Sequence, residues 1–510
     1  MERALTWEDY TPAQKKRHRR LEFVPATLVW FTLIGSVVLS FANPIWAVYF
    51  IIAFDLYWFF RVLYFVIFLT ISWRRHRGAV DIDWDAALKK TAGWERLRHL
   101  IFLPTYKEDI EIMRATFRSL TAAKVDPKTM IVVLAGEERA GREAFLERAE
   151  AIRAEFGDRF LRLIVTVHPS DIIGDIAGKG SNLHYAGPFA QKAVDELGIA
   201  YEDVIVSTFD IDTIAHPQYF AHLAKTYLST PNRTHASYQP VVLYSNNIWD
   251  APAIVRIAAF GTTFWLLSEL VRPDRLFTFS SHSMPFRALV DVGFWQRDVV
   301  SEDSRIYLQC FLRYNGDYRV VPLYVPVSMD AVMAPKWIGS LINLYKQQRR
   351  WAWGAEHFPY LAINFKAKGK SIPLRKRFST LWVLTEGMYT WATAPLLIFL
   401  LGWLPLNIAR FSGRPEIVFQ NAPITLQWIM TFAMLGVFAS AILSLPLLPS
   451  RPRHKNPYLQ VVMLLQWMLL PFTFIIFGSV PAIDAQTRLL LGRRLGFWVT
   501  PKTVLEKKTP

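Results

Sequence analysis

The sequence predicts an α/β domain inserted between transmembrane helices, and three observations support this fold class. Hydrophobic residues make up 52% of the 510 residues, while charged residues fall to 20%, below the roughly 25% of a typical soluble domain. Long apolar runs lie near both ends of the chain. The central part carries short apolar runs separated by helix-length segments. The one cysteine, Cys310, excludes an intramolecular disulfide framework and a Cys-rich zinc site.

Two transmembrane helices are expected near the N-terminus. Residues 24–42 and 44–71 can each supply the roughly 20 residues that cross a bilayer, and the turn between them predicts a hairpin. Basic residues flank the hairpin at 15–20 and 74–77, and because cationic flanks mark the cytoplasmic side, residues 1–23 are expected there. A signal peptide is the alternative for the first run, but the acidic, aromatic start and the lack of a small-residue cleavage site argue against it.

Residues 72–378 are expected to form a cytosolic α/β domain in which no segment spans a bilayer. Strand-like runs alternate here with helical patterns, an order typical of βαβ units and a parallel sheet. The runs lie at residues 100–103, 130–134, 161–165 and 204–209, and clear helical patterns lie at 109–122 and 138–155. In such sheets ligands bind beyond the carboxyl ends of the strands, so the residues just after these runs matter most.

Lipid-like sequence returns in residues 379–448. Residues 381–404 and 424–448 are strong candidates for two further transmembrane helices. The basic loop at 451–455 would then lie on the cytoplasmic side, as its charge requires.

A last apolar run, at residues 457–480, could be a fifth span, which would put the basic tail outside. Pro471 lies in its middle. Because proline interrupts the hydrogen bonds of a helix, we favour a broken interfacial or re-entrant segment followed by a cytosolic tail within residues 449–510.

Polar residues follow the first and fourth predicted strands. The first strand ends in a turn at residues 104–108 that could place side chains against a nucleotide, although proline after a strand is ordinary. The fourth ends in Asp210 and Asp212, and an extended chain points both carboxylates to one face. Hard oxygen ligands at a strand end suit Mg²⁺ or Mn²⁺ carried by a diphosphate. An isolated Asp-x-Asp is more often a solvated loop.

Three more clusters each have a functional and a plain interpretation. Lys179, in a glycine loop, could hold a phosphate or belong to a simple turn. Glu302 and Asp303 could supply a general base, or they could mark a helix N-terminus. The helical stretch 347–351 offers a guanidinium for phosphate and an indole face for a sugar ring, or it is an interfacial anchor.

The order of these clusters resembles the membrane-embedded family 2 glycosyltransferases, the group of cellulose, hyaluronan and chitin synthases. A nucleotide turn, a lysine loop, Asp-x-Asp, Glu-Asp and Gln-x-x-Arg-Trp follow one another inside one domain bracketed by membrane helices. The resemblance covers roughly residues 100–351 and extends more loosely to the tail. It implies an α/β GT-A domain, Rossmann-like and nucleotide-sugar-binding, with interfacial helices near its end.

The resemblance also implies roles for individual residues. The nucleotide-sugar donor would be contacted by Thr105, Tyr106, Glu108, Glu137, Lys179 and Asp210. Asp212 would bind a Mg²⁺ or Mn²⁺ ion. Asp303, beside Glu302, would be the base that deprotonates the acceptor hydroxyl, and attack opposite the leaving nucleotide would invert the anomeric centre. The acceptor and diphosphate side would comprise Gln347, Arg350 and Trp351, with Trp351 under the acceptor sugar.

The tail resembles the gating loop of cellulose synthases, which closes over the bound donor. The matching positions are Phe497, Val499, Thr500 and Lys502. A gating loop must reach the cytosolic site, so the match favours four spans. The tail is too short for the cyclic-dinucleotide sensor domain of some bacterial cellulose synthases, so regulation by that route is not expected.

The chain departs from the family pattern at two places. Where the family has Asp-Asp-Gly after the second strand, Glu137 stands in for the missing aspartate and is one methylene longer. The acceptor-side motif reads Ser281-His282-Ser283, which leaves the acceptor open.

Two functions therefore remain. The first is a processive hexosyltransferase that polymerises sugar from a UDP-sugar and exports the polysaccharide, with accessory export subunits as possible partners. The second is a single-transfer enzyme that glycosylates a membrane lipid. The net charge is +16, but the basic residues cluster at membrane flanks, so nucleic-acid binding is not expected. The expected location is the inner or plasma membrane, with the catalytic domain in the cytoplasm.

Overall fold

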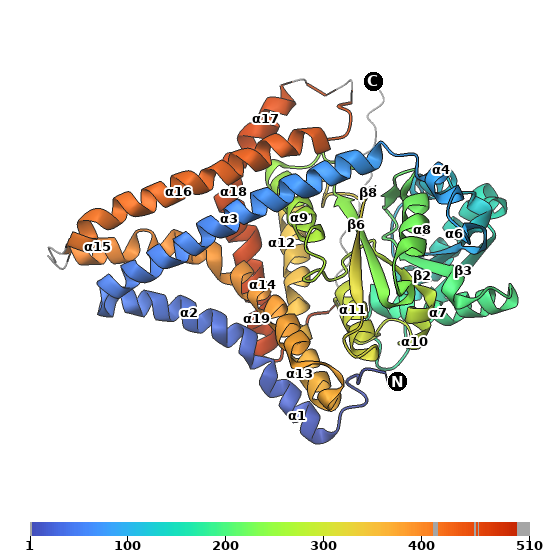
Figure 1. Cartoon of the computed structure of the whole chain (residues 1–510), viewed down its shortest axis with the longest axis horizontal. Coiled ribbons are helices and arrows are strands. Elements are labelled where there is room, and N and C mark those ends of the chain that lie inside the picture. Colours follow the sequence, from blue (N-terminus) through green and yellow to red (C-terminus); the bar gives the residue numbers. More distant parts are fainter. Residues whose placement is uncertain (1–2, 412–416, 453–454, 457, 497–510) are drawn as a thin grey trace.

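The apolar runs near both chain ends form long helices that lie together on one side of the molecule (Figure 1). The structure is a computed structural model and describes residues 3–411, 417–452, 455–456 and 458–496. The helices of this bundle are α1 (Pro12–Leu21), α2 (Phe23–Ala42), α3 (Pro44–Val80), α14 (Leu374–Leu401), α15 (Leu404–Phe411), α16 (Ile417–Ser444), α17 (Leu459–Leu465), α18 (Leu470–Phe474) and α19 (Val480–Leu490). Because α16 packs along α3 while α14 and α19 pack along α2, the two ends of the chain build one bundle.

Six helices in the described ranges are long and apolar enough to cross a membrane, judged by length and composition. They comprise Pro12–Ala42, Pro44–Val80, Ala253–Leu270, Leu374–Phe411, Phe419–Leu447 and Leu459–Leu490. These helices are compatible with an integral membrane protein, whereas the number of segments that cross and their orientation stay predictions.

One of the six lies where the sequence predicts no span. No span is expected between residues 72 and 378, yet α9 (Ala253–Leu270) meets the length and composition of one. It is the least apolar of the six, with a mean hydropathy of 1.3, and 61% of its apolar window is buried inside the protein. Since α9 packs against strand β6 (Ala236–Leu243) and helix α3, protein atoms cover much of its apolar surface.

The last apolar run is irregular at the predicted place. Between α17 and α19 the chain passes through a 3₁₀ turn (Gln466–Leu469), the short helix α18 and a π-helical turn (Ile475–Ser479). Pro471 stands in the first turn of α18, where its missing N–H costs no helical hydrogen bond. Whether this segment crosses the bilayer or lies at its surface stays a prediction.

The central domain is built on one mixed sheet of eight strands. They are β1 (Arg98–Pro104), β2 (Met130–Glu137), β3 (Arg162–His168), β4 (Val204–Thr208), β5 (Ile214–Ala215), β6 (Ala236–Leu243), β7 (Ser283–Pro285) and β8 (Arg319–Ser328). Their order is β3-β2-β1-β4-β7-β6-β8-β5. The first four strands are parallel neighbours, as their sequence pattern predicts, and β7 runs antiparallel to both β4 and β6.

Helices cover this sheet and join it to the bundle. They are α4 (Trp84–Lys89), α5 (Ile110–Thr121), α6 (Arg142–Phe156), α7 (Lys179–Glu196), α8 (Tyr219–Ser229), α9, α10 (Phe286–Asp291), α11 (Glu302–Arg313), α12 (Trp337–Ala352) and α13 (His357–Ala367). The predicted helices at 109–122 and 138–155 are confirmed as α5 and α6. Helix α12 packs against α19, and α13 packs against α1 and α14, so these two helices connect the domain to the bundle.

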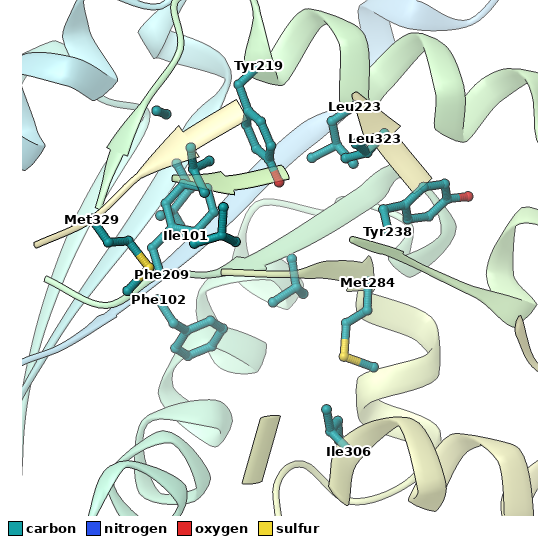
Figure 2. Close-up of a cluster of buried hydrophobic side chains, with 14 of the residues drawn as sticks. Ile101, Phe102, Phe209, Tyr219, Leu223, Tyr238, Met284, Ile306, Leu323 and Met329 are labelled. Carbon is teal, nitrogen blue, oxygen red and sulfur yellow. The ribbon is translucent and has the colours of Figure 1, made fainter. Parts of the chain in front are cut away.

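The core of the domain supports the carboxyl ends of its parallel strands. Nearly every residue of β1, β2 and β4 is buried. Figure 2 shows the centre of this core, where Phe102 from β1 and Met284 from β7 lie among buried side chains that include Ile306 of α11. Phe209 belongs to the same cluster and directly precedes Asp210, so the core holds the end of β4 in place. The fold class agrees with the prediction of an α/β domain inserted between long apolar helices.

Candidate functional site

The turn after β1 is held by a buried carboxylate. Oε2 of Glu108 accepts hydrogen bonds from the Thr105 hydroxyl (2.9 Å) and from the backbone N–H of Tyr106 (2.6 Å). The backbone N–H of Thr105 donates to the carbonyl of Ala135 on β2. The turn is therefore fixed between two strand ends, and the three residues predicted to line the nucleotide lie in it.

Glu137 ends the neighbouring strand β2 and has a partner that the sequence analysis missed. Its buried carboxylate is bound by the guanidinium of Arg139. That guanidinium also lies 5.3 Å from the centre of the Tyr106 ring. Within the described part of the chain, the buried Nη2 of Arg139 has no hydrogen-bond partner. An aromatic face beside a buried donor and a carboxylate can hold a nucleobase and ribose.

Lys179 is the centre of the charged part of the site. Its ammonium lies 2.9 Å from Oδ1 of Asp210, 2.9 Å from Oδ1 of Asp303 and 3.6 Å from Oε1 of Glu302. Burial by itself would lower the pKa of Lys179, but the three carboxylates outweigh burial and raise it. The lysine is therefore charged and brings the end of β4 together with the start of α11.

A glycine next to this lysine allows the two elements to approach. A Cβ on Gly180 would lie 3.2 Å from the Cβ of Glu302 and 3.0 Å from the carbonyl oxygen of Gln296. The first turn of α7 can lie against α11 because no side chain intervenes. The glycine loop that is predicted to hold a phosphate therefore packs against the acidic pair.

Asp210 and Asp212 are held differently. Asp210 accepts a hydrogen bond from the hydroxyl of Ser280 (3.0 Å) in addition to its ion pair with Lys179. Asp212 is buried, and its Oδ2 accepts from the backbone N–H of Asp330 (3.1 Å) at the end of β8. Two strand ends therefore fix the Asp-x-Asp segment.

Tyr244 is the second residue that the sequence analysis missed. It follows β6 directly, and its ring centre lies 6.2 Å from that of Trp351. Burial is the main cause that raises the pKa of its hydroxyl. The charges of Asp210, Asp212 and Asp303 raise this pKa further, and the charge of Arg350 opposes them. Tyr244 thus lies between the carboxylates and helix α12.

Helix α12 presents three predicted residues to this region. Gln347, Arg350 and Trp351 are spaced i, i+3 and i+4, so they share one face of the helix. The charge of Arg350 acts on both Glu302 and Tyr244, so this face turns towards α11 and the end of β6.

Glu302 is the most deeply buried carboxylate of the cluster, with a side chain 2% exposed. Neither of its oxygens has a hydrogen-bond partner among the residues that the structure describes. Burial and the charge of Asp303 raise its pKa to about 7, and the charges of Lys179 and Arg350 oppose that rise. Glu302 therefore retains its proton at a higher pH than an ordinary glutamate.

The carboxylates of this site are hard oxygen ligands of the kind that a divalent ion prefers. No group of three or more His, Cys, Asp or Glu side chains with metal-binding geometry occurs in the described ranges. Mg²⁺ is commonly bound by one or two carboxylates and completed by substrate phosphates. Asp210 and Asp212 provide such oxygens beside an acidic cluster whose charge favours a cation. The residues therefore fit an ion that arrives with a diphosphate.

Most of the predicted residues lie around two connected regions. The turn after β1 and Glu137 are at the ends of β1 and β2, and the charged cluster of Lys179, Asp210, Glu302 and Asp303 is at the end of β4. Asn182 of α7 joins them, because its amide donates to the Ala135 carbonyl (2.8 Å) that also accepts from Thr105. The four gating-loop positions, Phe497, Val499, Thr500 and Lys502, lie outside the described residues.

The altered acceptor motif is a structural part of the sheet. Ser283 belongs to β7, and its hydroxyl shares hydrogen bonds with those of Ser207 (2.7 Å) and Tyr219 (2.9 Å). His282 is buried, its Nδ1 lies 2.9 Å from the Phe279 carbonyl, and burial lowers its pKa. His282 nevertheless lies close to the site, because the charges of Asp303 and Lys179 affect the pKa of its imidazole.

Comparison with known proteins gives one family match and several weaker likenesses. A family model described as glycosyl transferase family group 2 matches residues 205–480. The poly-beta-1,6-N-acetyl-D-glucosamine synthase of Staphylococcus aureus is 32% identical over 107 residues, 20% of this chain. The match spans only 24% of the length of that relative.

Two solved structures align with this chain at low identity. The mannosyltransferase PcManGT of Pyrobaculum calidifontis, in complex with GDP-Man and Mn²⁺, aligns with a TM-score of 0.42 at 14% identity over 84% of this chain and 100% of its own. Staphylococcus aureus TarS 1–349, in complex with UDP-GlcNAc, aligns with a TM-score of 0.30 at 13% identity over 67% of this chain and 90% of its own.

Proposed function

The chain belongs to glycosyl transferase family group 2 and is a glycosyltransferase, and from this premise we propose its reaction. It is an inverting membrane enzyme that transfers a hexose from a UDP-sugar to a growing polysaccharide, with synthesis coupled to export. One observation carries the proposal. The ammonium of Lys179 lies 2.9 Å from a carboxylate oxygen of Asp210 and 2.9 Å from one of Asp303, beside the face of α12 that carries Arg350 and Trp351.

The donor nucleotide lies against the ends of β1 and β2. Tyr106 offers its ring to the base, while Glu137 and Arg139 offer an acceptor and a donor to the polar edge of the base and to the ribose. The diphosphate extends towards the end of β4, where Lys179 and Arg350 supply positive charge. Thr105 and Glu108 keep the turn in place.

A divalent ion, Mg²⁺ or Mn²⁺, would be held by Asp212 with Asp210 and by the diphosphate oxygens. When bound, it supplies positive charge that neutralises the leaving diphosphate. Lys179 balances part of the negative charge of the acidic residues around that position.

The transfer step is a single displacement. Asp303 accepts the proton of the acceptor hydroxyl, and the hydroxyl oxygen forms a bond to the anomeric carbon. The bond between that carbon and the diphosphate oxygen breaks on the opposite face, and the nucleoside diphosphate leaves with the electron pair. Glu302, which keeps its proton more readily than an ordinary glutamate, lies beside Asp303 and limits the negative charge there.

The acceptor end lies on the face of α12. The indole of Trp351 supports a sugar ring, and Gln347 one turn earlier offers hydrogen bonds to sugar or phosphate oxygens. Because α12 packs on α19, the product is delivered to the helix bundle. Residues 24–71 and 379–448 supply four transmembrane helices, and residues 449–510 supply an interfacial segment and a cytosolic tail that acts as a gating loop.

In this proposal, residues 72–378 lie in the cytoplasm at the inner or plasma membrane. The basic flanks at 15–20 and 74–77 support that orientation. The partners are then the nucleotide-sugar donor, the polysaccharide acceptor and membrane lipid, and accessory subunits that receive the exported polymer.

Incubation of the purified, reconstituted protein with labelled UDP-sugars and Mg²⁺ or Mn²⁺ tests the proposal. A ladder of products that lengthens with time supports a processive polysaccharide synthase. Transfer of a single sugar to an added lipid would replace it by the alternative, a single-transfer enzyme for a membrane lipid. Release of no nucleotide from any labelled sugar nucleotide would contradict both.

A further inference from the structure

The segment that follows Trp351 is bonded to the first turn of the acidic helix α11. It forms a 3₁₀ turn, Trp353–Glu356, and continues as α13 from His357. The buried carboxylate of Glu356 accepts a hydrogen bond from the Ser301 hydroxyl (2.9 Å) and another from the indole N–H of Trp353 (2.9 Å). One carboxylate thus links the residue before Glu302 to the turn after α12.

Ser301 uses its side chain in an unusual way for its position. It is the N-cap of α11, where a serine ordinarily accepts a hydrogen bond from a backbone N–H of the first turn. Here its side chain makes no capping bond and donates to Glu356 instead. The Ser301 hydroxyl therefore does not stabilise its own helix end but binds a residue 55 positions later in the chain.

His357 makes the second link, on the other side of the acidic pair. Its Nδ1 accepts from Nε of Arg305 (3.1 Å), which can only donate, so the ring proton lies on Nε2. Nε2 then donates to the hydroxyl of Ser304 (2.8 Å), the residue after Asp303. Burial and the charge of Arg305 lower the pKa of His357 well below its ordinary value, so the ring stays neutral and keeps this tautomer.

Arg305 is fixed by contacts on two further sides. Its Nη1 donates to the side-chain oxygen of Gln296 (3.0 Å), and its guanidinium lies 3.9 Å from the ring centre of Tyr360 on α13. Arg305 and His357 are both buried. The contacts therefore leave His357 little freedom to turn away from Ser304.

We propose that Glu356 and His357 are positioning residues that fix the carboxylate of Asp303 relative to the acceptor face of α12. Their partners, Ser301 and Ser304, flank the acidic pair, and both residues follow Trp351 within two helical turns. The inference rests on the proposed function, in which Asp303 is the base and Trp351 supports the acceptor. A base must lie within hydrogen-bond reach of its proton, and a misplacement of about 1 Å can reduce the rate about 100-fold.

The first test removes the Ser301 link from either end. Glu356→Ala deletes the acceptor, and Ser301→Ala deletes the donor. We expect each variant to lower kcat by about 30- to 100-fold while the KM for the donor changes by less than about 3-fold. The double variant should be no slower than the worse single variant, because both changes break one contact. Ser237→Ala, which removes a buried hydroxyl bonded to Tyr318 (2.8 Å) at the other end of β6, is the matched control.

The second test uses rescue at His357. Glutamine can accept from Arg305 and donate to Ser304, so His357→Gln should keep most of kcat, whereas His357→Ala should lose it. If the contact is merely structural, the two variants should differ in melting temperature according to the side-chain volume lost. Their kcat values should then be equal. Misplacement of the base should also reduce transfer to the acceptor more than hydrolysis of the donor by water.

The outcomes separate this inference from the function on which it rests. If the wild-type protein transfers sugar but Glu356→Ala and Ser301→Ala retain its kcat, the inference is overturned and the function stands. A rise in donor KM as large as the fall in kcat would also overturn it, since that indicates general distortion. If the wild-type protein releases no nucleotide from any donor, the proposed function has failed first. Should Glu356→Ala not fold, Ser301→Ala carries the same test with the loss of one hydroxyl.

Discussion

Replacement of Lys179 by methionine is the strongest perturbation of the charged cluster. The change keeps an unbranched chain of similar length but removes the ammonium that contacts Asp210 and Asp303 at 2.9 Å. At an effective dielectric constant of about 20, each such contact is worth about 6 kcal/mol of Coulomb attraction. The desolvation of the charges offsets much of this, and removal of one partner from a buried ion pair typically costs about 3–5 kcal/mol.

The lower end of that range applies to Lys179. The side chains of Asp210 and Asp303 are 27% and 22% exposed, so water partly screens them once the lysine is lost. We therefore expect the free energy of unfolding of the Lys179→Met variant to fall by about 3 kcal/mol. We expect kcat/KM to fall by about 100- to 1000-fold, because loss of one preorganised charge at the leaving diphosphate removes about 3–4 kcal/mol of transition-state stabilisation.

The assay is release of nucleoside diphosphate at several donor concentrations, together with donor binding by titration. Lys225→Met is the control, since Lys225 lies on α8 and its ammonium donates to Thr91 (3.3 Å) outside the site. The control should retain the wild-type kcat/KM within about 3-fold. A Lys179→Met protein that folds and keeps both kcat and donor KM within the same limits would refute the role of this charge.

Three further predictions concern single side chains of the site. Trp351→Ala should weaken acceptor engagement and leave donor hydrolysis largely intact, which nucleotide release with and without acceptor would reveal; equal losses in both would contradict the acceptor role. Asp212→Ala should abolish metal-dependent turnover, and full wild-type activity in EDTA would disprove the metal assignment. Glu302→Gln tests the raised pKa of the Glu302 carboxyl. The wild type loses stability as the pH rises from 4.5 to about 7, because Glu302 gives up its proton at a lower pH in the unfolded chain than in the folded protein. Melting temperatures should therefore favour the variant increasingly across that range, and a constant difference would contradict the shift.

The sequence predicts the parallel half of the sheet well and the rest poorly. Strands β1 to β4 are short apolar runs between helical patterns, and the burial of β1, β2 and β4 on both faces is visible in the sequence. Strand β6 contains Pro240, and β8 contains Pro322 and Pro326, residues that ordinarily argue against a strand. Strand β7 has three residues and takes its place only through pairing with β4 and β6.

The site shows the same division between motif and context. Asp-x-Asp, Glu-Asp and Gln-x-x-Arg-Trp could be found because each is a short run of polar residues after or within a predicted element. Tyr244 belongs to no such run, and only the fold brings it to Trp351, 6.2 Å between ring centres. Likewise Lys179 meets Asp303 across 124 positions. Contacts of that range depend on the packing of α7 against α11, which no local pattern encodes.

Asp303→Asn, assayed with a labelled sugar nucleotide that the wild-type protein uses, tests the central claim most directly. Asparagine keeps the shape of the side chain and an oxygen for Lys179, but it cannot take the acceptor proton. We predict that donor affinity stays within about 3-fold of the wild type while transfer falls by about 100- to 10,000-fold, the range for loss of a general base. Transfer by the Asp303→Asn variant at the wild-type rate would contradict the claim that a sugar passes from a diphosphate to a hydroxyl at this cluster of residues.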